Sequence, residues 1–217
     1  MTNLFWYFPC LPKLELSMAR NKILLLISFI VLVVIIIYSV GGDYSPGEYA
    51  EYIKKEREEQ ERFMRYDEES PFVTSKIEFS PLSHYPADLK YRIKGRFEAI
   101  EAPKIRNLGT NDGKQEQYME YGYALFELDG KDNKLLIFEN VTEEKLFLAF
   151  GDATSAVETY GAGRYLDIEH SGGKTIKLDF NLAYNPYCAY VDNFSCPLPP
   201  RENLLEIAIK AGEKDYH

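Results

Sequence analysis

Three charged residues near the carboxyl end of the chain have side chains suited to acid–base or anion chemistry. Arg164 stands in the stretch GAGRYLD, Asp179 opens the stretch DFNLAYNP, and Glu202 follows shortly after CPLPP. A carboxylate can act as a general acid or base, and a guanidinium can clamp an anion. We expect the first two stretches to lie side by side, so that Arg164 meets Asp179 or Glu202. A buried brace between two loops is favoured over catalysis, because structural ion pairs also perturb pKa values.

The segment from 179 to 205 gathers many polar residues in what must be largely irregular structure, because YNPY and CPLPP interrupt a strand. Such side chains satisfy the unpaired backbone groups of a long loop, and in functional loops they also converge on ligands. Both interpretations stay open. The candidate binding residues, together with Arg164, are Asn181, Tyr184, Asn185 and Asn203.

Two cysteines, Cys188 and Cys196, lie in the same segment. If the domain lies outside the cytoplasm, we expect them to form a disulfide that closes the loop. These cysteines with a histidine would make a poor zinc site, since structural zinc takes four ligands at tighter spacing. The sequence has no HExxH, GxSxG or CxxC motif, so we expect neither a metal nor a cofactor.

The charge balance excludes one class of partner. The 25 Lys and Arg residues are outnumbered by 34 Asp and Glu residues, which gives a formal net charge of -9. Nucleic-acid binding needs a dense basic surface to neutralise phosphates. We therefore expect no nucleic-acid partner.

An uncharged apolar run, ILLLISFIVLVVIIIYSV, covers residues 23–40. A helix of this length spans about 27 Å, close to the thickness of a bilayer core. A cleavable signal peptide is the alternative, but its apolar region is usually only about 7–15 residues long. Lys13, Arg20 and Lys22 precede the run and acidic residues follow it. This predicts a signal-anchor with residues 1–22 in the cytoplasm and the carboxyl-terminal domain outside. Because MARNKILLL is itself a complete signal-anchor beginning, Met18 is an alternative start.

Residues 45–69 are predicted to form a charged amphipathic helix, a stalk between the membrane and the domain. The stretch SPGE at 45–48 has the pattern of a capping box with proline at the first helical position. The stretch SPF at 70–72 ends the helix, because the residue before proline resists the helical conformation.

Residues 70–217 are predicted to form a β-rich domain. KYRIKGRFEA alternates apolar and charged residues, as a half-exposed strand does, and turn residues such as NDGK, DGKDNK and SGGK separate the runs that follow. We predict a mainly β fold with an N-terminal helix, an antiparallel sandwich or partly open barrel, preceded by a single transmembrane helix. The further strands are expected in MEYGYALFEL, KLLIFEN, KLFLAF, KTIKLDF and LLEIAIK.

Several of these stretches are similar to a known family. TYGAGRYLD, LDFNLAYNPYCAY and CPLPPRENLLEIAIKAGEK resemble the hallmark segments of the domain-of-unknown-function family numbered sixteen eighty-four, and ESPF and PADLKYRI resemble its amino-terminal part. The likeness covers roughly residues 45–217. The family has no assigned reaction, so the resemblance implies a domain boundary and motif positions but no mechanism.

Two function classes follow. The favoured one is a membrane-anchored ligand-binding or protein-interaction module outside the cytoplasm, because no nucleophile–base pair can be found in the sequence. The alternative is a hydrolase-type enzyme that uses Asp179 or Glu202 as acid or base and Arg164 as an anion clamp. The sequence indicates neither the reaction nor the ligand.

Overall fold

The computed structural model describes residues 27–29, 31 and 44–217. Contacts divide the chain into two units, Met1–Ser45 and Pro46–His217, and the β-rich fold belongs to the second. The predicted cytoplasmic segment 1–22 and the predicted span 23–40 lie outside the described residues, apart from 27–29 and 31, which are helical. Among the residues that are described, none belongs to a helix both long and apolar enough to cross a membrane.

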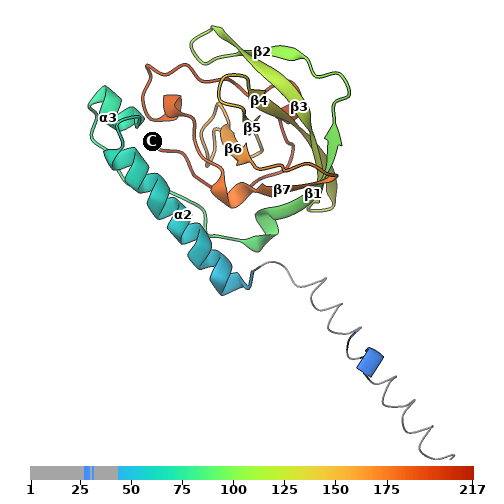
Figure 1. Cartoon of the computed structure of the whole chain (residues 1–217). Helices are drawn as coiled ribbons and strands as arrows, with labels where there is room; N and C mark the ends of the chain where they lie inside the picture. The colour runs from blue at the N-terminus through green and yellow to red at the C-terminus, as the bar shows by residue number, and fades with distance from the viewer. Residues whose placement is uncertain (1–26, 30, 32–43) are drawn as a thin grey trace, which may run out of the picture. The chain divides into compact units, whose positions relative to one another are not determined.

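The helix α2 (Pro46–Tyr66) lies along one side of the β-rich unit (Figure 1). Tyr49, Ile53 and Met64 share one face of the helix, and that face is buried. The remaining faces carry mostly charged side chains. The helix is therefore packed into the domain, whereas its charged middle predicted a solvated stalk.

A short helix, α3 (Pro71–Ser75), follows α2. Ser70 caps it: its hydroxyl accepts a hydrogen bond from the backbone N–H of Phe72 at 3.2 Å and donates one to the carbonyl of Met64. Phe72 packs with Met64, Tyr190 and Val191 in a small apolar cluster. This cluster holds the end of α2 against the loop that contains the two cysteines.

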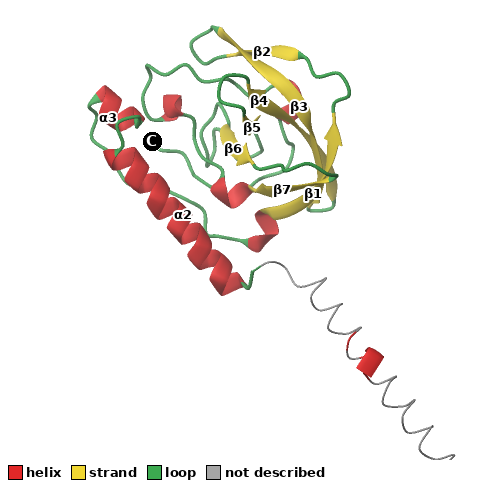
Figure 2. Ribbon diagram, viewed as in Figure 1, coloured by secondary structure: helices red, strands yellow, loops and turns green. Residues whose placement is uncertain are grey.

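Seven strands form one antiparallel sheet in the order β6-β5-β4-β3-β1-β7, with β2 also paired to β3 (Figure 2). Asp129 and Gly130 link β3 to β4 with positive φ angles of 54° and 72°, as a tight hairpin turn requires. The strands are β1 (Arg92–Ala99), β2 (Ile105–Gly109), β3 (Gln115–Leu128), β4 (Lys131–Asn140), β5 (Lys145–Phe150), β6 (Arg164–Ile168) and β7 (Thr175–Asp179). Short 3-10 turns are η1 (Leu89–Tyr91), η2 (Phe180–Leu182), η3 (Tyr187–Ala189) and η4 (Arg201–Asn203).

The sheet curls back on itself beyond β7. Tyr165 in β6 and Tyr184 exchange two backbone hydrogen bonds of 2.8 and 3.0 Å in an isolated antiparallel bridge. GAGRYLD and DFNLAYNP thus lie side by side, as predicted. The sheet is antiparallel and curved into a half-barrel, which agrees with the partly open barrel among the predicted alternatives and with the predicted mainly β fold.

Part of the core inside the curled sheet comes from a carboxyl-terminal segment that is not itself a strand. The segment after η4 contributes Ile207, Ile209 and Ala211 to the main core. The predicted strand over LLEIAIK is wrong, because these residues form no ladder with any strand in the described part of the chain. The apolar residues of this segment alternate because every second side chain is buried in the core. The strand residues of the same core include Ala124, Phe126, Leu135, Ile137, Leu148, Phe150, Leu166, Ile176 and Leu178.

Asn203 attaches the start of this carboxyl-terminal segment to the sheet through side-chain hydrogen bonds. Its side-chain oxygen accepts from the N–H of Leu136 at 2.7 Å, and its amide nitrogen donates to the carbonyls of Leu136 and Ala149, both at 2.9 Å. The buried amide therefore supplies the hydrogen bonds that a neighbouring strand would supply where β4 and β5 separate.

Candidate functional site

Arg164, the first residue of β6, is only 1% exposed. One terminal nitrogen, Nη1, donates to the carbonyls of Ala211 and Glu213, and the other, Nη2, donates to the carbonyl of Ile209 at 2.9 Å. These carbonyls belong to alternate residues of the carboxyl-terminal segment. The guanidinium thus occupies the position that a hydrogen-bonding strand would occupy beside them.

The negative partner of Arg164 is Asp152. Nη2 lies 2.9 Å from Oδ2 of Asp152, and both side chains are 1% exposed. The other carboxylate oxygen accepts hydrogen bonds from the N–H and hydroxyl of Thr154, at 2.8 and 2.7 Å, and from the N–H of Ile209, at 3.1 Å. An ion pair so well supplied with hydrogen bonds is suited to bracing two loops.

The expected meeting of Arg164 with Asp179 or Glu202 is therefore wrong. Asp179 accepts a 2.6 Å hydrogen bond from the hydroxyl of Tyr49 and lies 3.5 Å from Arg92. Glu202 is exposed and pairs with Arg106. The three residues have different partners and form no common acid–base site.

The predicted binding residues are engaged by the protein itself. Asn181 exchanges two hydrogen bonds of 2.9 Å with the backbone of Asp88. The hydroxyl of Tyr184 donates to Asp167 at 2.8 Å, and Asn203 bridges β4 and β5. These contacts favour the loop-bracing interpretation of the asparagines.

The fourth predicted residue, Asn185, donates hydrogen bonds to Glu213, a residue that the sequence analysis did not identify. Glu213 is 0% exposed, and its carboxylate accepts from the backbone and side chain of Asn185 at 3.1 and 2.9 Å. Tyr190 donates to both carboxylate oxygens at 2.7 and 2.8 Å, and Gln60 of α2 donates at 3.3 Å. Glu213 thus joins the helix, the cysteine loop and the chain end. The only sequence signal was the preceding Gly212, whose φ of 76° and contact with the carbonyls of residues 180 and 183 leave no room for a side chain.

Burial raises the pKa of Glu213 to about 7, and the hydrogen bonds from Tyr190, Asn185 and Gln60 oppose that rise. His84 pairs with Glu213 through the backbone in an isolated bridge. Burial, and then the charge of Arg57, lower the pKa of His84 to about 4. This neighbouring pair therefore carries opposite shifts.

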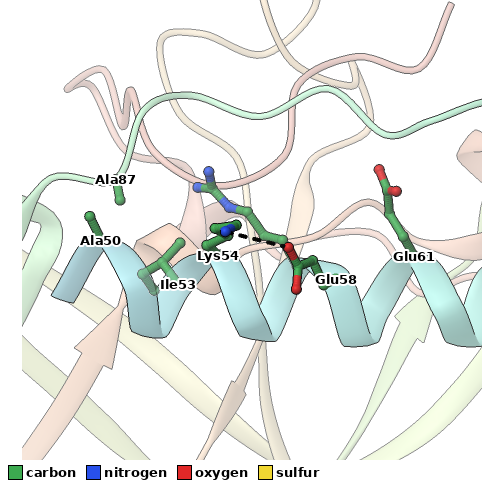
Figure 3. Close-up of a pocket in the computed structure, with 7 residues that line it drawn as sticks. Ala50, Ile53, Lys54, Glu58, Glu61 and Ala87 are labelled. Atoms are coloured by element: carbon green, nitrogen blue, oxygen red, sulfur yellow. Dashed lines mark ion pairs between the residues drawn. The ribbon is translucent and has the colours of Figure 1, made fainter. Parts of the chain in front are cut away.

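A groove of about 350 Å³ lies between α2 and the segment around Ala87. Figure 3 shows Ala50, Lys54 and Glu61 along the helix, with Ala87 on the facing segment. Arg57 also lines the groove; its Nη2 donates to the carbonyl of Asn181 at 3.4 Å, and its Nε is buried without a hydrogen-bond partner. Sequence reasoning missed Arg57, because it stands in a helix with charges throughout.

Cys188 and Cys196 are buried free thiols in contact with each other. The N–H of Cys188 donates to the sulfur of Cys196 at 3.2 Å, and the hydroxyl of Tyr160 donates to the sulfur of Cys188 at 3.8 Å. The hydrogen bond from Cys196 lowers the pKa of Cys188 to about 7. The disulfide stays a prediction.

Within the described ranges, no three His, Cys, Asp or Glu side chains are grouped so as to hold a metal ion.

Comparison with known proteins places the chain in a family. A family model described as "Protein of unknown function (DUF1684)" matches residues 77–214. The chain belongs to the DUF1684 family. This confirms the resemblance seen in the sequence, and the matched region begins after α2 and α3. No curated protein matches the chain.

A solved structure resembles this DUF1684 protein. It is the solution NMR structure of an uncharacterised protein of Haloarcula marismortui, with 36% sequence identity and a TM-score of 0.60. The match covers 75% of this chain and 92% of the archaeal one. Neither comparison names an activity, so a functional assignment for the DUF1684 domain depends on its geometry.

The pKa of Glu213 predicts a pH dependence of stability. Because the folded-state pKa is raised from 4.5 to about 7, the contribution of Glu213 is fully present below about pH 4.5 and is lost as the pH rises through 7. The loss amounts to about 3 kcal/mol. His84 acts in the opposite direction, so the free energy of unfolding should be compared between wild type and Glu213→Gln across this range.

The stability of wild type relative to Glu213→Gln should fall by about 3 kcal/mol as the pH rises from 4.5 to above 7. Glu206→Gln, at an exposed position, should follow wild type. A difference that is constant with pH would contradict the raised pKa.

Proposed function

We propose that this protein is a membrane-anchored binding module outside the cytoplasm, and that the groove between α2 and the segment around Ala87 is its ligand-binding surface. The observation that carries the proposal is the groove itself, a hollow of about 350 Å³ lined by apolar and charged side chains. Ligand sites are concave and combine apolar walls with a few polar groups.

Binding is a better account of the charged residues than hydrolysis. Both terminal nitrogens of Arg164 bond to Asp152 or to the carboxyl-terminal segment, and the side chain is 1% exposed, so it cannot clamp a substrate. Asp179 and Glu202 face other cations. Glu213 has the raised pKa of an acid–base group, but it is 0% exposed and its hydrogen bonds come from the protein. These pairings disfavour the hydrolase interpretation.

The membrane anchor in this proposal is supported by the uncharged run over 23–40 and its basic leading flank. An oxidising compartment would also allow the neighbouring Cys188 and Cys196 to form the predicted disulfide.

Filling the groove should abolish binding. We expect ligands that raise the melting temperature of the full chain in a screened panel to lose this effect in Ala87→Trp, because the indole occupies the space beside α2. The control is Val157→Trp, at a position that is 80% exposed on another loop. Stabilising ligands that act equally on wild type and Ala87→Trp would show that the groove is not the site.

The topology can be tested with reporters fused after residue 217. A reporter that becomes active only after export should be active, and one that works only in the cytoplasm should be silent. The reverse pattern would refute the anchor and the location together.

A further inference from the structure

The guanidinium of Arg57 is short of partners. It carries five N–H donors, yet its one hydrogen bond among the described residues is the long contact of 3.4 Å from Nη2 to Asn181. Nε is buried without a partner, and burial lowers the pKa of the side chain. Buried donors are normally satisfied, and since Nε is enclosed by the protein itself, only the terminal nitrogens of Arg57 can meet an acceptor in the groove.

The acids nearby do not supply that acceptor. Asp179 is close enough to raise the pKa of Arg57, but it bonds to Tyr49 and Arg92. Oε1 of Glu58 lies 3.9 Å from Nζ of Lys54. Oε1 of Glu61 accepts a hydrogen bond of 3.1 Å from the N–H of Leu82. In the described part of the chain, Arg57 makes no ion pair within 4.0 Å. Its positive charge therefore has no carboxylate in direct contact at the groove.

We infer that Arg57 binds the carboxylate of a small ligand, a monocarboxylate with a short apolar body that lies in the groove between Ala50 and Ala87. This rests on the proposed function of the groove. A carboxylate matches the two terminal nitrogens of the guanidinium and accepts hydrogen bonds from them. The small side chains of Ala50 and Ala87 leave room for the apolar body.

The charge of the ligand follows from the balanced lining. Glu58 and Glu61 line the same groove as Lys54 and Arg57, so the formal charges of the lining cancel. A monocarboxylate adds one negative charge to this neutral groove, whereas a doubly charged phosphate adds two beside the same carboxylates. The groove therefore selects a monoanion.

The probes are N-acetylalanine and its uncharged amide, which have the same body and differ in the carboxylate. Each is titrated into the isotope-labelled full chain, and the NMR signal of the Arg57 Nε–H is followed. N-Acetylalanine should shift this signal in a saturable way, and the amide should bind at least about tenfold more weakly, because a charge-assisted hydrogen bond is lost. Inorganic phosphate should bind more weakly than N-acetylalanine.

Arg57→Gln should weaken N-acetylalanine binding by at least about tenfold, followed through the amide signals of Ala50 and Ala87. Arg57→Lys should restore part of the affinity, since it keeps the charge but loses the planar donor edge. The matched control is Arg62→Gln, on the same helix, where the side chain is 70% exposed and pairs with Glu59. It should bind like wild type.

Three results would overturn the inference: equal binding of the acid and the amide, tighter binding of phosphate, or no signal change at the groove with any probe. If both probes bind, both are blocked by Ala87→Trp, and Arg57→Gln has no effect, the groove is a binding surface and only the carboxylate assignment fails. If ligands from the screened panel ignore Ala87→Trp, the proposed function fails as well.

Discussion

The structure depends on Arg164, whose side chain makes the hydrogen bonds that a neighbouring strand would otherwise make. Arg164 donates to the carbonyls of Ile209, Ala211 and Glu213, which have no strand beside them. Asp152 balances its charge and binds the N–H of Ile209. Without this ion pair, the carboxyl-terminal segment would bring unpaired backbone groups into an apolar core, at a cost of about 1–3 kcal/mol for each group.

The position of the groove follows from that constraint. Because the segment is fixed, Gly212 and Glu213 lie under α2, where Glu213 accepts from Gln60. Tyr49 fixes the other end of the helix to Asp179. The groove lies along the helix near these two attachments. The buried polar network thus places the surface on which the proposed function depends, without itself taking part in binding.

Strands and turns that depend on the spacing of nearby residues could be predicted from the sequence. Alternation in KYRIKGRFEA and the DG turn at 129–130 gave correct strands and a correct hairpin. Alternation in LLEIAIK wrongly predicted a strand. Every second side chain of this segment is buried in the core, and that pattern has the same period of two as a strand in a sheet. The sequence favoured a brace role for Arg164 but named Asp179 or Glu202 as its partner. Asp152 was missed, because no pattern marks a carboxylate in a separate loop. Arg57 and Glu213 were missed because burial of a charge is decided by tertiary contacts alone.

The central claim is that Arg164 and Asp152 act as one buried unit that replaces a strand. A double-mutant cycle with Arg164→Met, Asp152→Asn and the double variant, followed by chemical unfolding, tests it most directly. We predict that each single change lowers the free energy of unfolding by about 3–5 kcal/mol, because the partner charge is left buried and alone. The double variant should lose clearly less than the sum. Single losses below about 1 kcal/mol that simply add would contradict the account, because they are typical of exposed ion pairs.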